Sequence, residues 1–440
     1  MNSLKVRTFY VFSIIAYIVE FIVLGFIDTA YQISILYIHT GLIGLATYLY
    51  FKTKNKANYF DFDSIFIVIS LIIGYLSMFF YKTDLQIVLH GFIQLPDSFI
   101  NKGIILYTIG LTSYYLGGVS AKESENKSAF FVPHISNTWL GYLIIILCVF
   151  LLTSDLLSYY ESMYQGGEVK SLAVKYSDFL IWVIVAYVSI ECHNNDYTSF
   201  RLTSHNVIPI VSVFVTALLI MLSGSRTLAS YYILPIMGAY FMFSKHLSLK
   251  AFAFIFCVVV FIMKVVQFTR QGNEVSIQET ISILNDLTCV SKHTFFAQVY
   301  VSDNGYLWGV NILVYAFAVV PGLSSFVFPN MREVGSAEIL TDYIYEITGF
   351  PGTAGLGTNI VADLYISFGV LSVICGMYFL GKIVNEKLQA AQSGSIYALS
   401  FYLALMAHSA FICRATFASP CKTVAWSLIL TWIAVRFAKK

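Results

Sequence analysis

The sequence predicts an all-α, polytopic membrane protein with about twelve transmembrane helices and one large external loop. Of the 440 residues, 58% are hydrophobic and only 11% are charged, and the mean hydropathy is +0.75. So little charge cannot cover the surfaces of several soluble domains. Apolar runs of about 20 residues, the length that crosses the hydrocarbon of a bilayer, recur along the chain with short polar breaks. Both observations place the chain in the lipid bilayer.

The apolar runs divide the chain into three sections. Residues 1–266 are expected to form an N-terminal bundle of about nine spans, residues 267–358 a large external loop region, and residues 359–440 three further spans. The first run is too long for a signal peptide and lacks a small-residue cleavage site, so it is expected to stay. The predicted spans lie near Phe9–Ile27, Tyr31–Phe51, Phe62–Tyr81, Gly103–Val119, Thr138–Leu152, Phe179–Glu191, Asn206–Leu222, Thr227–Phe243, Leu249–Val266, Asn359–Gly381, Ser395–Cys413 and Thr423–Arg436.

Basic residues favour the loops on the side of the N-terminus, which places both termini in the cytoplasm. One segment, Tyr306–Phe328, is long enough to cross as well, but a single crossing there would move the C-terminal tail outside. Pro321-Gly322 lies late in this segment. A broken, re-entrant or interfacial helix is therefore expected there, within the external loop region.

Several classes of chemistry lack support in the sequence. The net charge of +2 is spread without a basic block, so no nucleic-acid partner is expected. The seven cysteines lie singly, without the spacing of a zinc site, and are interpreted as packing residues. Neither HExxH, GxSxG nor a Walker A loop is present. We therefore expect neither a metal nor a cofactor.

Four arginines are expected on the external side, in or beside membrane-facing positions: Arg226, Arg270, Arg332 and Arg414. A guanidinium keeps its charge and binds phosphate oxygens with two parallel hydrogen bonds, so such a group suits a lipid phosphate or diphosphate. The alternative for Arg270 is an anchor at the membrane interface, and for Arg332 a solvated loop position.

The short turn that contains Arg226 favours an anion more strongly. An arginine between two closely spaced spans usually has an anionic partner, and Ser223 and Ser225 add hydroxyl groups beside it. The next helix begins at Thr227, where free backbone N–H groups also favour an anion. A purely structural role for Arg226 stays open.

Asn359 and Asp363 are one helical turn apart and project from one face at the external end of a span. An acidic side chain in a membrane helix suggests a functional site, although Asp363 paired with an arginine for packing alone is the alternative. His408 lies among apolar residues six positions before Arg414, where a hydrogen-bonded core histidine and a site residue are both open readings.

These residues resemble the oligosaccharide repeat-unit polymerases, or O-antigen polymerases of the Wzy type, which are related to the O-antigen ligases. The resemblance covers the chain from Ser223 onward. It rests on five short segments: Ser223-Gly-Ser-Arg-Thr227, Arg270-Gln-Gly272, the apolar segment that ends Phe328-Pro329, Gly357-Thr-Asn-Ile-Val-Ala-Asp-Leu-Tyr-Ile-Ser-Phe-Gly369, and His408–Arg414. In the segment that corresponds to Gly357–Gly369, ligases typically carry His-Asn about ten residues before the final glycine. Here Thr358 occupies the histidine position, which favours a polymerase.

The resemblance implies a metal-independent C-type glycosyltransferase in the bacterial inner membrane, with its active site on the periplasmic face. Such an enzyme moves a growing glycan from one undecaprenyl diphosphate to the sugar end of a second lipid-linked repeat unit in O-antigen synthesis. A chain-length regulator and a flippase would be its protein partners. Asp363 and Arg270 would be catalytic, with Asp363 orienting or deprotonating the acceptor hydroxyl. The substrate-binding residues would be Arg226, Arg414, Arg332, Asn359, Ser223, Ser225 and His408.

Three alternatives belong to other classes. A flippase also has about twelve spans, but usually shows repeat symmetry and short loops on both sides, neither of which is visible here. An O-antigen ligase would transfer finished glycan to the lipid A core. An O-acetyltransferase would need a nucleophile or acyl-carrier motif that the sequence lacks.

Overall fold

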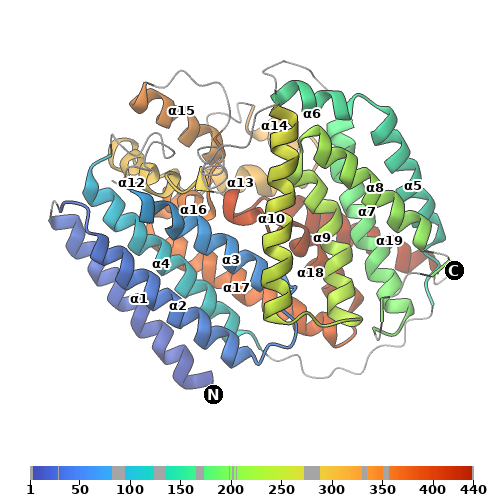
Figure 1. Ribbon diagram of the computed structural model, residues 1–440, viewed down its shortest axis with the longest axis horizontal. Helices are drawn as coiled ribbons and strands as arrows, with labels where there is room; N and C mark the ends of the chain where they lie inside the picture. The colour runs from blue at the N-terminus through green and yellow to red at the C-terminus, as the bar shows by residue number, and fades with distance from the viewer. Residues whose placement is uncertain are drawn as a thin grey trace.

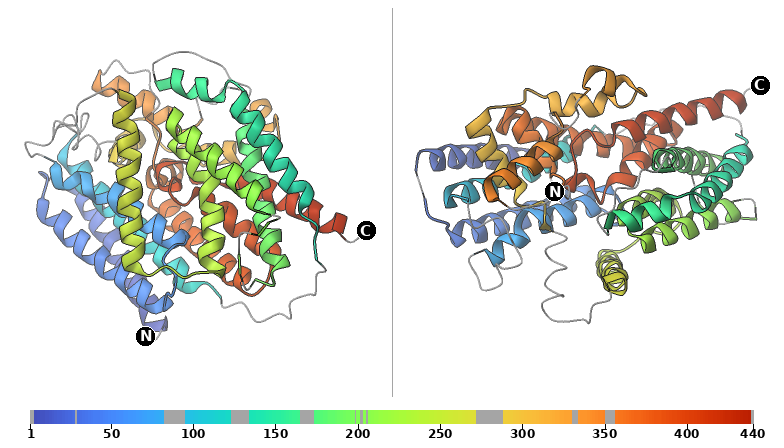
Figure 2. Two further views of the ribbon diagram at one scale, coloured as in Figure 1. Left: turned by 45° about the vertical axis from the view of Figure 1, so that its right-hand side comes forward. Right: turned by 90° about the horizontal axis from the view of Figure 1, so that it is seen from above.

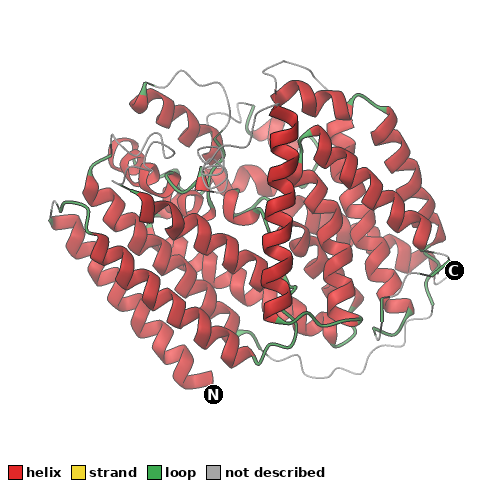
Figure 3. Cartoon of the chain, viewed as in Figure 1, coloured by secondary structure: helices red, strands yellow, loops and turns green. Residues whose placement is uncertain are grey.

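The computed structural model of the chain is helical throughout the residues that it describes, with no strand among them (Figure 3). The described residues are 3–27, 29–81, 95–122, 134–164, 173–197, 199–200, 203–204, 206–271, 288–329, 334–349 and 356–438. The predicted all-α class is confirmed.

In chain order the α-helices and the two 3-10 helices, η1 and η4, run as follows: α1 (Ser3–Phe26), α2 (Ile33–Lys54), α3 (Phe62–Tyr75), η1 (Leu76–Phe80), α4 (Asp97–Ser120), α5 (Thr138–Thr153), α6 (Leu156–Tyr164), α7 (Ala173–Asn194), α8 (Val207–Ser223), α9 (Arg226–Phe243), α10 (Leu249–Gln271), α12 (His293–Asn304), α13 (Val310–Phe317), α14 (Leu323–Val327), α15 (Ser336–Thr348), α16 (Ile360–Phe368), α17 (Val370–Gln392), α18 (Ile396–His408), η4 (Ile412–Arg414) and α19 (Cys421–Ala438).

Every predicted span contains an α-helix, although in Ser395–Cys413 the helix α18 ends at His408 and a turn and the 3-10 helix η4 follow. Four helical segments of the described chain are both long and apolar enough to cross a membrane by themselves: Leu4–Phe26, Ile33–Lys54, Phe62–Phe80 and Tyr176–Asn194. Their outward faces carry large apolar side chains, such as Phe12 and Ile15 of α1. A surface of this kind is stable in lipid and not in water. The structure therefore supports a membrane protein, while the count of twelve crossings stays a prediction.

Glycines allow α4 and α17 to form the closely packed centre of the molecule. A Cβ atom at Gly117 of α4 would overlap the carbonyl of Tyr378 in α17, and one at Gly381 of α17 would overlap the carbonyl of Tyr114 in α4. Small residues at such positions let two helix backbones approach closely, which is a common way to join helices in membranes. The first and third sections of the sequence therefore meet along this contact.

Two predicted segments are each divided between two helices. The predicted span Asn359–Gly381 is divided between α16 and α17 at Gly369, which has φ +69°. A Cβ atom at this position would lie 2.8 Å from the hydroxyl oxygen of Tyr306. In Tyr306–Phe328, helix α13 ends before Pro321 and α14 begins after Gly322, whose φ is +81°. Glycine adopts such backbone angles without a steric penalty. The break predicted at Pro321-Gly322 is confirmed.

Different helices and connections lie at the two ends of the molecule (Figure 1). Helices α12 to α16, the turn between α8 and α9 and the C-terminal end of α10 lie at the upper end, and the N-terminus and the α9–α10 connection lie at the lower end. Helix α10 lies on the outside of the body, and its Phe254 and Phe261 are exposed (Figure 2). The described residues among those predicted to be external thus lie at one end of the helical body.

Candidate functional site

Asn359 fixes the start of α16. Its side-chain oxygen accepts a hydrogen bond from the backbone N–H of Ala362 at 2.9 Å, which is the usual geometry of an N-cap. Its amide nitrogen donates to the carbonyl of Val290 at 2.7 Å and lies 3.0 Å from the hydroxyl of Thr294 in α12. The side chain is completely buried. Asn359 therefore joins α16 to the start of α12.

Asp363, one turn later, is also completely buried and joins α16 to two other parts of the chain. Its Oδ1 accepts from the amide of Asn311 in α13 at 2.7 Å, and its Oδ2 accepts from the backbone N–H of Phe417 at 2.7 Å. Ser367 donates to the side-chain oxygen of Asn311 at 2.9 Å and completes the group. In the described chain no lysine or arginine pairs with this carboxylate, so the alternative of an Asp363–arginine packing pair has no support in this part of the structure.

Arg414 lies at the end of η4, three residues before the backbone group that Asp363 holds. Its Nη2 donates to the Sγ of Cys289 at 3.2 Å, and its side chain is half-buried. Among the residues that the structure describes, no carboxylate forms an ion pair with this guanidinium. Because a half-buried cation without a counter-ion is costly, Arg414 is well suited to receive an anion.

His293 and Lys292 add to the charge pattern around Arg414. Burial is the main reason that the pKa of His293 falls from 6.5 to about 3, and the positive charges of Lys292 and Arg414 lower it further. Burial also lowers the pKa of Lys292. His293 Nδ1 lies 3.1 Å from the carbonyl of Val290, whereas its Nε2 has no hydrogen-bond partner among the described residues. The imidazole is therefore neutral near pH 7, beside two cationic side chains.

The predicted turn between α8 and α9 lies at the same end of the molecule (Figure 1). Ser223 donates to the carbonyl of Ile220 in its own helix at 2.9 Å, and Ser225 precedes the first residue of α9, Arg226. No hydrogen bond or ion pair joins this turn to Asp363 or Arg414 in the described residues. The structure thus places the turn at the expected end without linking it to the Asp363 group.

His408 has the surroundings of a core histidine. It is 5% exposed, its Nε2 lies 2.9 Å from the hydroxyl of Thr423, and its ring packs on Tyr231 with a centroid separation of 4.4 Å. Its contacts join α18 to α9 and α19. Its predicted role in substrate binding has no support from these contacts.

Two predicted site residues, Arg270 and Arg332, lie partly or wholly outside the described residues. Arg270 belongs to the last turn of α10, at the expected end, but its side chain lies outside the described residues. Arg332 lies entirely outside them. Their predicted roles stay predictions.

Sequence reasoning missed four contributors to this group: Asn311, His293, Lys292 and Cys289. Asn311 carries the clearest signal, because it is an isolated amide in the apolar segment Tyr306–Phe328. The other three precede or begin α12 and could be connected with Arg414 only in three dimensions. No group of three His, Cys, Asp or Glu side chains suited to a metal ion occurs among the described residues.

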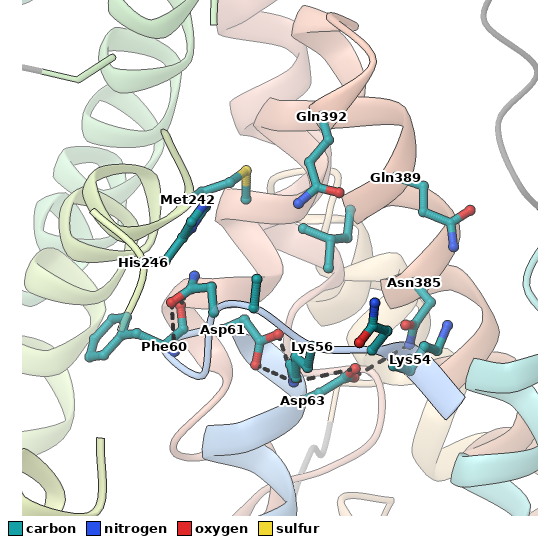
Figure 4. A pocket seen from close by; sticks show the side chains of 14 residues that line it. Lys54, Lys56, Phe60, Asp61, Asp63, Met242, His246, Asn385, Gln389 and Gln392 are labelled. Carbon is teal, nitrogen blue, oxygen red and sulfur yellow. Dashed lines mark hydrogen bonds and ion pairs between the residues drawn. The ribbon is translucent and has the colours of Figure 1, made fainter. Parts of the chain in front are cut away.

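A second polar group lies at the opposite end, beside a cavity of about 270 Å³ (Figure 4). Lys56 lies 2.7 Å from Asp61 and 3.8 Å from Asp63. Asp63 also accepts hydrogen bonds from Tyr50 at 2.7 Å and from Tyr114. This group joins α2, α3 and α4. It was not predicted, although Asp61 and Asp63 at the start of a span, five and seven residues after a lysine, are a visible signal.

No protein-family model matches the chain, and comparison with curated proteins and with solved structures found no significant match.

Proposed function

We propose that the chain is a metal-independent membrane glycosyltransferase that polymerises oligosaccharide repeat units carried on undecaprenyl diphosphate. The proposal places the reaction at the end of the molecule that holds Arg414, on the periplasmic face of a bacterial inner membrane. The product would be O-antigen or a related surface polysaccharide. The proposal combines the sequence resemblance with the charge pattern of this end.

The observation that carries the proposal is the guanidinium of Arg414, which forms no ion pair with any carboxylate of the described residues. Polymerisation breaks a bond between a sugar and a lipid diphosphate, so negative charge grows on the leaving diphosphate. A fixed cation in a partly buried position stabilises that charge and needs little reorganisation when the bond breaks. Lys292 adds a second positive charge, because Lys292 and Arg414 both lie close enough to His293 to lower its pKa.

Asp363 and Asn359 hold the surroundings of Arg414 in place. Asp363 accepts a hydrogen bond from the backbone N–H of Phe417, three residues after Arg414. Asn359 donates to the carbonyl of Val290. Val290 follows Cys289, and the thiol of Cys289 accepts the hydrogen bond from Arg414. Both carboxylate oxygens of Asp363 already accept hydrogen bonds from the protein. In this proposal Asp363 is a positioning residue first, and its predicted role as the base for the acceptor hydroxyl would use a remaining lone pair of one of these oxygens.

A gel of surface polysaccharide from cells that lack the gene tests the proposal. The cells are complemented with the natural sequence, with Arg414→Gln, or with Arg436→Gln as the control. Arg436 is an exposed arginine near the C-terminus, beside Trp432. Membrane levels of each variant are measured by blot.

The expected result is a ladder of repeat lengths with the natural sequence and with Arg436→Gln, and glycan-capped lipid A of a single repeat with Arg414→Gln. A strain without the gene that still makes the full ladder would contradict polymerisation. A strain without any glycan-capped lipid would instead indicate a flippase or a ligase.

A further inference from the structure

A second cavity lies between the ends of three helices on the side of the molecule away from Arg414. It has a volume of about 610 Å³ and lies where α7 ends and α5 and α8 begin. Its polar wall carries amides, hydroxyls, the exposed imidazole of His134 and one carboxylate, that of Glu191. Among the described residues that line it, none is a lysine or an arginine.

The negative charge of Glu191 is surrounded by neutral groups. Its Oε2 accepts from the amide of Asn137 at 2.7 Å, and its Oε1 accepts from the amide of Asn206 at 2.9 Å and lies 3.4 Å from that of Asn195. No cation pairs with Glu191 in the part of the chain that the structure describes. Three amides orient the carboxylate but leave its charge uncompensated, so the cavity favours a cationic group.

The starts of two helices lie at the same wall. Asn137 and Asn206 occupy the N-cap positions of α5 and α8, yet neither side chain caps its helix. Both amide nitrogens donate to Glu191, and the side-chain oxygen of Asn206 accepts from the backbone N–H of Thr203 instead of from its own helix. The first turn of α5 therefore keeps backbone N–H groups without a side-chain acceptor, at a cavity wall that also carries the hydroxyls of Ser136 and Thr138. Such a wall favours a phosphate beside the cation site.

The cavity continues into an apolar surface. Tyr142, Ile145 and Ile208 line it, and the helices beyond carry exposed side chains such as Ile146 and Val211. Glu191 lies in the last turn of α7, within the segment Tyr176–Asn194 that is able to cross a membrane. The polar part of the cavity thus lies at the depth of lipid headgroups, next to a surface that suits acyl chains.

We infer that this cavity binds the headgroup of an aminophospholipid, such as phosphatidylethanolamine. The ammonium group lies against Glu191, the phosphate lies at the start of α5, and the acyl chains follow α5 and α8. The inference is independent of the proposed glycosyltransferase activity, because Glu191 and Arg414 belong to different helices and different ends of the molecule.

Native mass spectrometry of the purified full-length chain in detergent tests the inference. The protein is titrated with short-chain phosphatidylethanolamine, and with phosphatidylglycerol and phosphatidylcholine that carry the same chains. We expect phosphatidylethanolamine to bind at least about tenfold more tightly than phosphatidylglycerol, because a charge-assisted hydrogen bond to Glu191 contributes only with the ammonium. Equal affinity for the two lipids would overturn the inference.

Two variants locate the site. Glu191→Gln removes the charge and keeps the size of the side chain, and should abolish the preference for phosphatidylethanolamine. Glu386→Gln, which removes a carboxylate from the surface pair with Lys382, is the matched control and should keep it. An unchanged preference in Glu191→Gln would overturn the inference.

Ile208→Trp supplies a test that leaves the Glu191 hydrogen bonds in place. Ile208 is 60% exposed at the cavity wall, so a larger side chain there obstructs the cavity without entering the core. Phosphatidylethanolamine should bind about tenfold less tightly to this variant. Unchanged binding, or equally tight binding of phosphoethanolamine without acyl chains to the natural protein, would overturn a lipid site.

Discussion

Lys56 and Arg414 are both cations in an apolar helical body, but among the described residues Lys56 has carboxylate partners and Arg414 has none. Lys56 lies 2.7 Å from Asp61 and 3.8 Å from Asp63, and its side chain is 9% exposed. Arg414 donates to a thiol and pairs with no carboxylate of the described chain. A cation that is paired with carboxylates of the same chain stabilises the fold. A cation that lacks such a carboxylate is able to bind an anionic ligand. The two ends of the molecule therefore differ in whether their cations are paired with carboxylates, and not in the presence of a cation.

The largest effect is expected from breaking the closed group. Lys56→Met leaves Asp61 and Asp63 without their cation in a buried site, which should lower the free energy of unfolding by about 3 to 5 kcal/mol. Thermal unfolding of the purified protein in detergent measures this. Lys52→Met, at an exposed lysine in the last turn of α2, four residues before Lys56, should change stability by less than about 0.5 kcal/mol. Equal effects of the two variants would show that the Lys56 group does not stabilise the fold.

The next effect concerns the group that positions Arg414. Asp363→Ala removes the acceptor of the Asn311 amide and of the Phe417 N–H, which should cost about 2 to 4 kcal/mol in the same unfolding measurement. Asp363→Asn keeps one acceptor oxygen and should recover about half of this loss. If both variants were as stable as the natural protein, the hydrogen bonds of Asp363 would not hold these segments together.

A pH dependence should distinguish the Arg414 end. His293 has a pKa of about 3 in the folded protein against 6.5 when exposed, so the folded state disfavours its proton. Its contribution to stability is complete above pH 6.5 and falls by about 1.4 kcal/mol per pH unit as the pH drops from 6.5 towards 3. His293→Phe should remove this part of the acid sensitivity, and His246→Phe, at an exposed histidine, should not. Identical pH profiles for all three proteins would refute a neutral buried His293.

The smallest effect on stability is expected at Arg414. Because Arg414→Gln breaks no ion pair within the described chain, it should lower the free energy of unfolding by less than about 1 kcal/mol. This small value, set beside the large one for Lys56→Met, would sharpen the contrast between the two cations. A loss as large as that of Lys56→Met would mean that Arg414 is a structural residue.

The sequence predicts the helices well because hydropathy and helix length are local properties. It could not place the division between α16 and α17, since Gly369 adopts its backbone conformation beside Tyr306, a residue 63 positions earlier. Sequence order also suggested an arginine partner for Asp363, whereas the fold supplies Asn311 and a backbone N–H. Partners that come from distant helices cannot be deduced from spacing along the chain.

The charged groups show the same limit. The sequence presents Lys56 as one of several basic residues in a loop, and Glu191 as the end of an apolar run. Only the fold reveals that Asp61 and Asp63 surround the lysine and that three asparagine side chains surround the glutamate.

The most direct test of the proposed function uses the purified protein in vesicles with a synthetic repeat unit on undecaprenyl diphosphate, in the presence of a metal chelator. The natural protein should lengthen the glycan and release undecaprenyl diphosphate, and Arg414→Gln should do so at least about 100-fold more slowly at equal protein stability. A natural protein that forms no longer glycan, or an Arg414→Gln variant with the natural rate, would contradict the proposal.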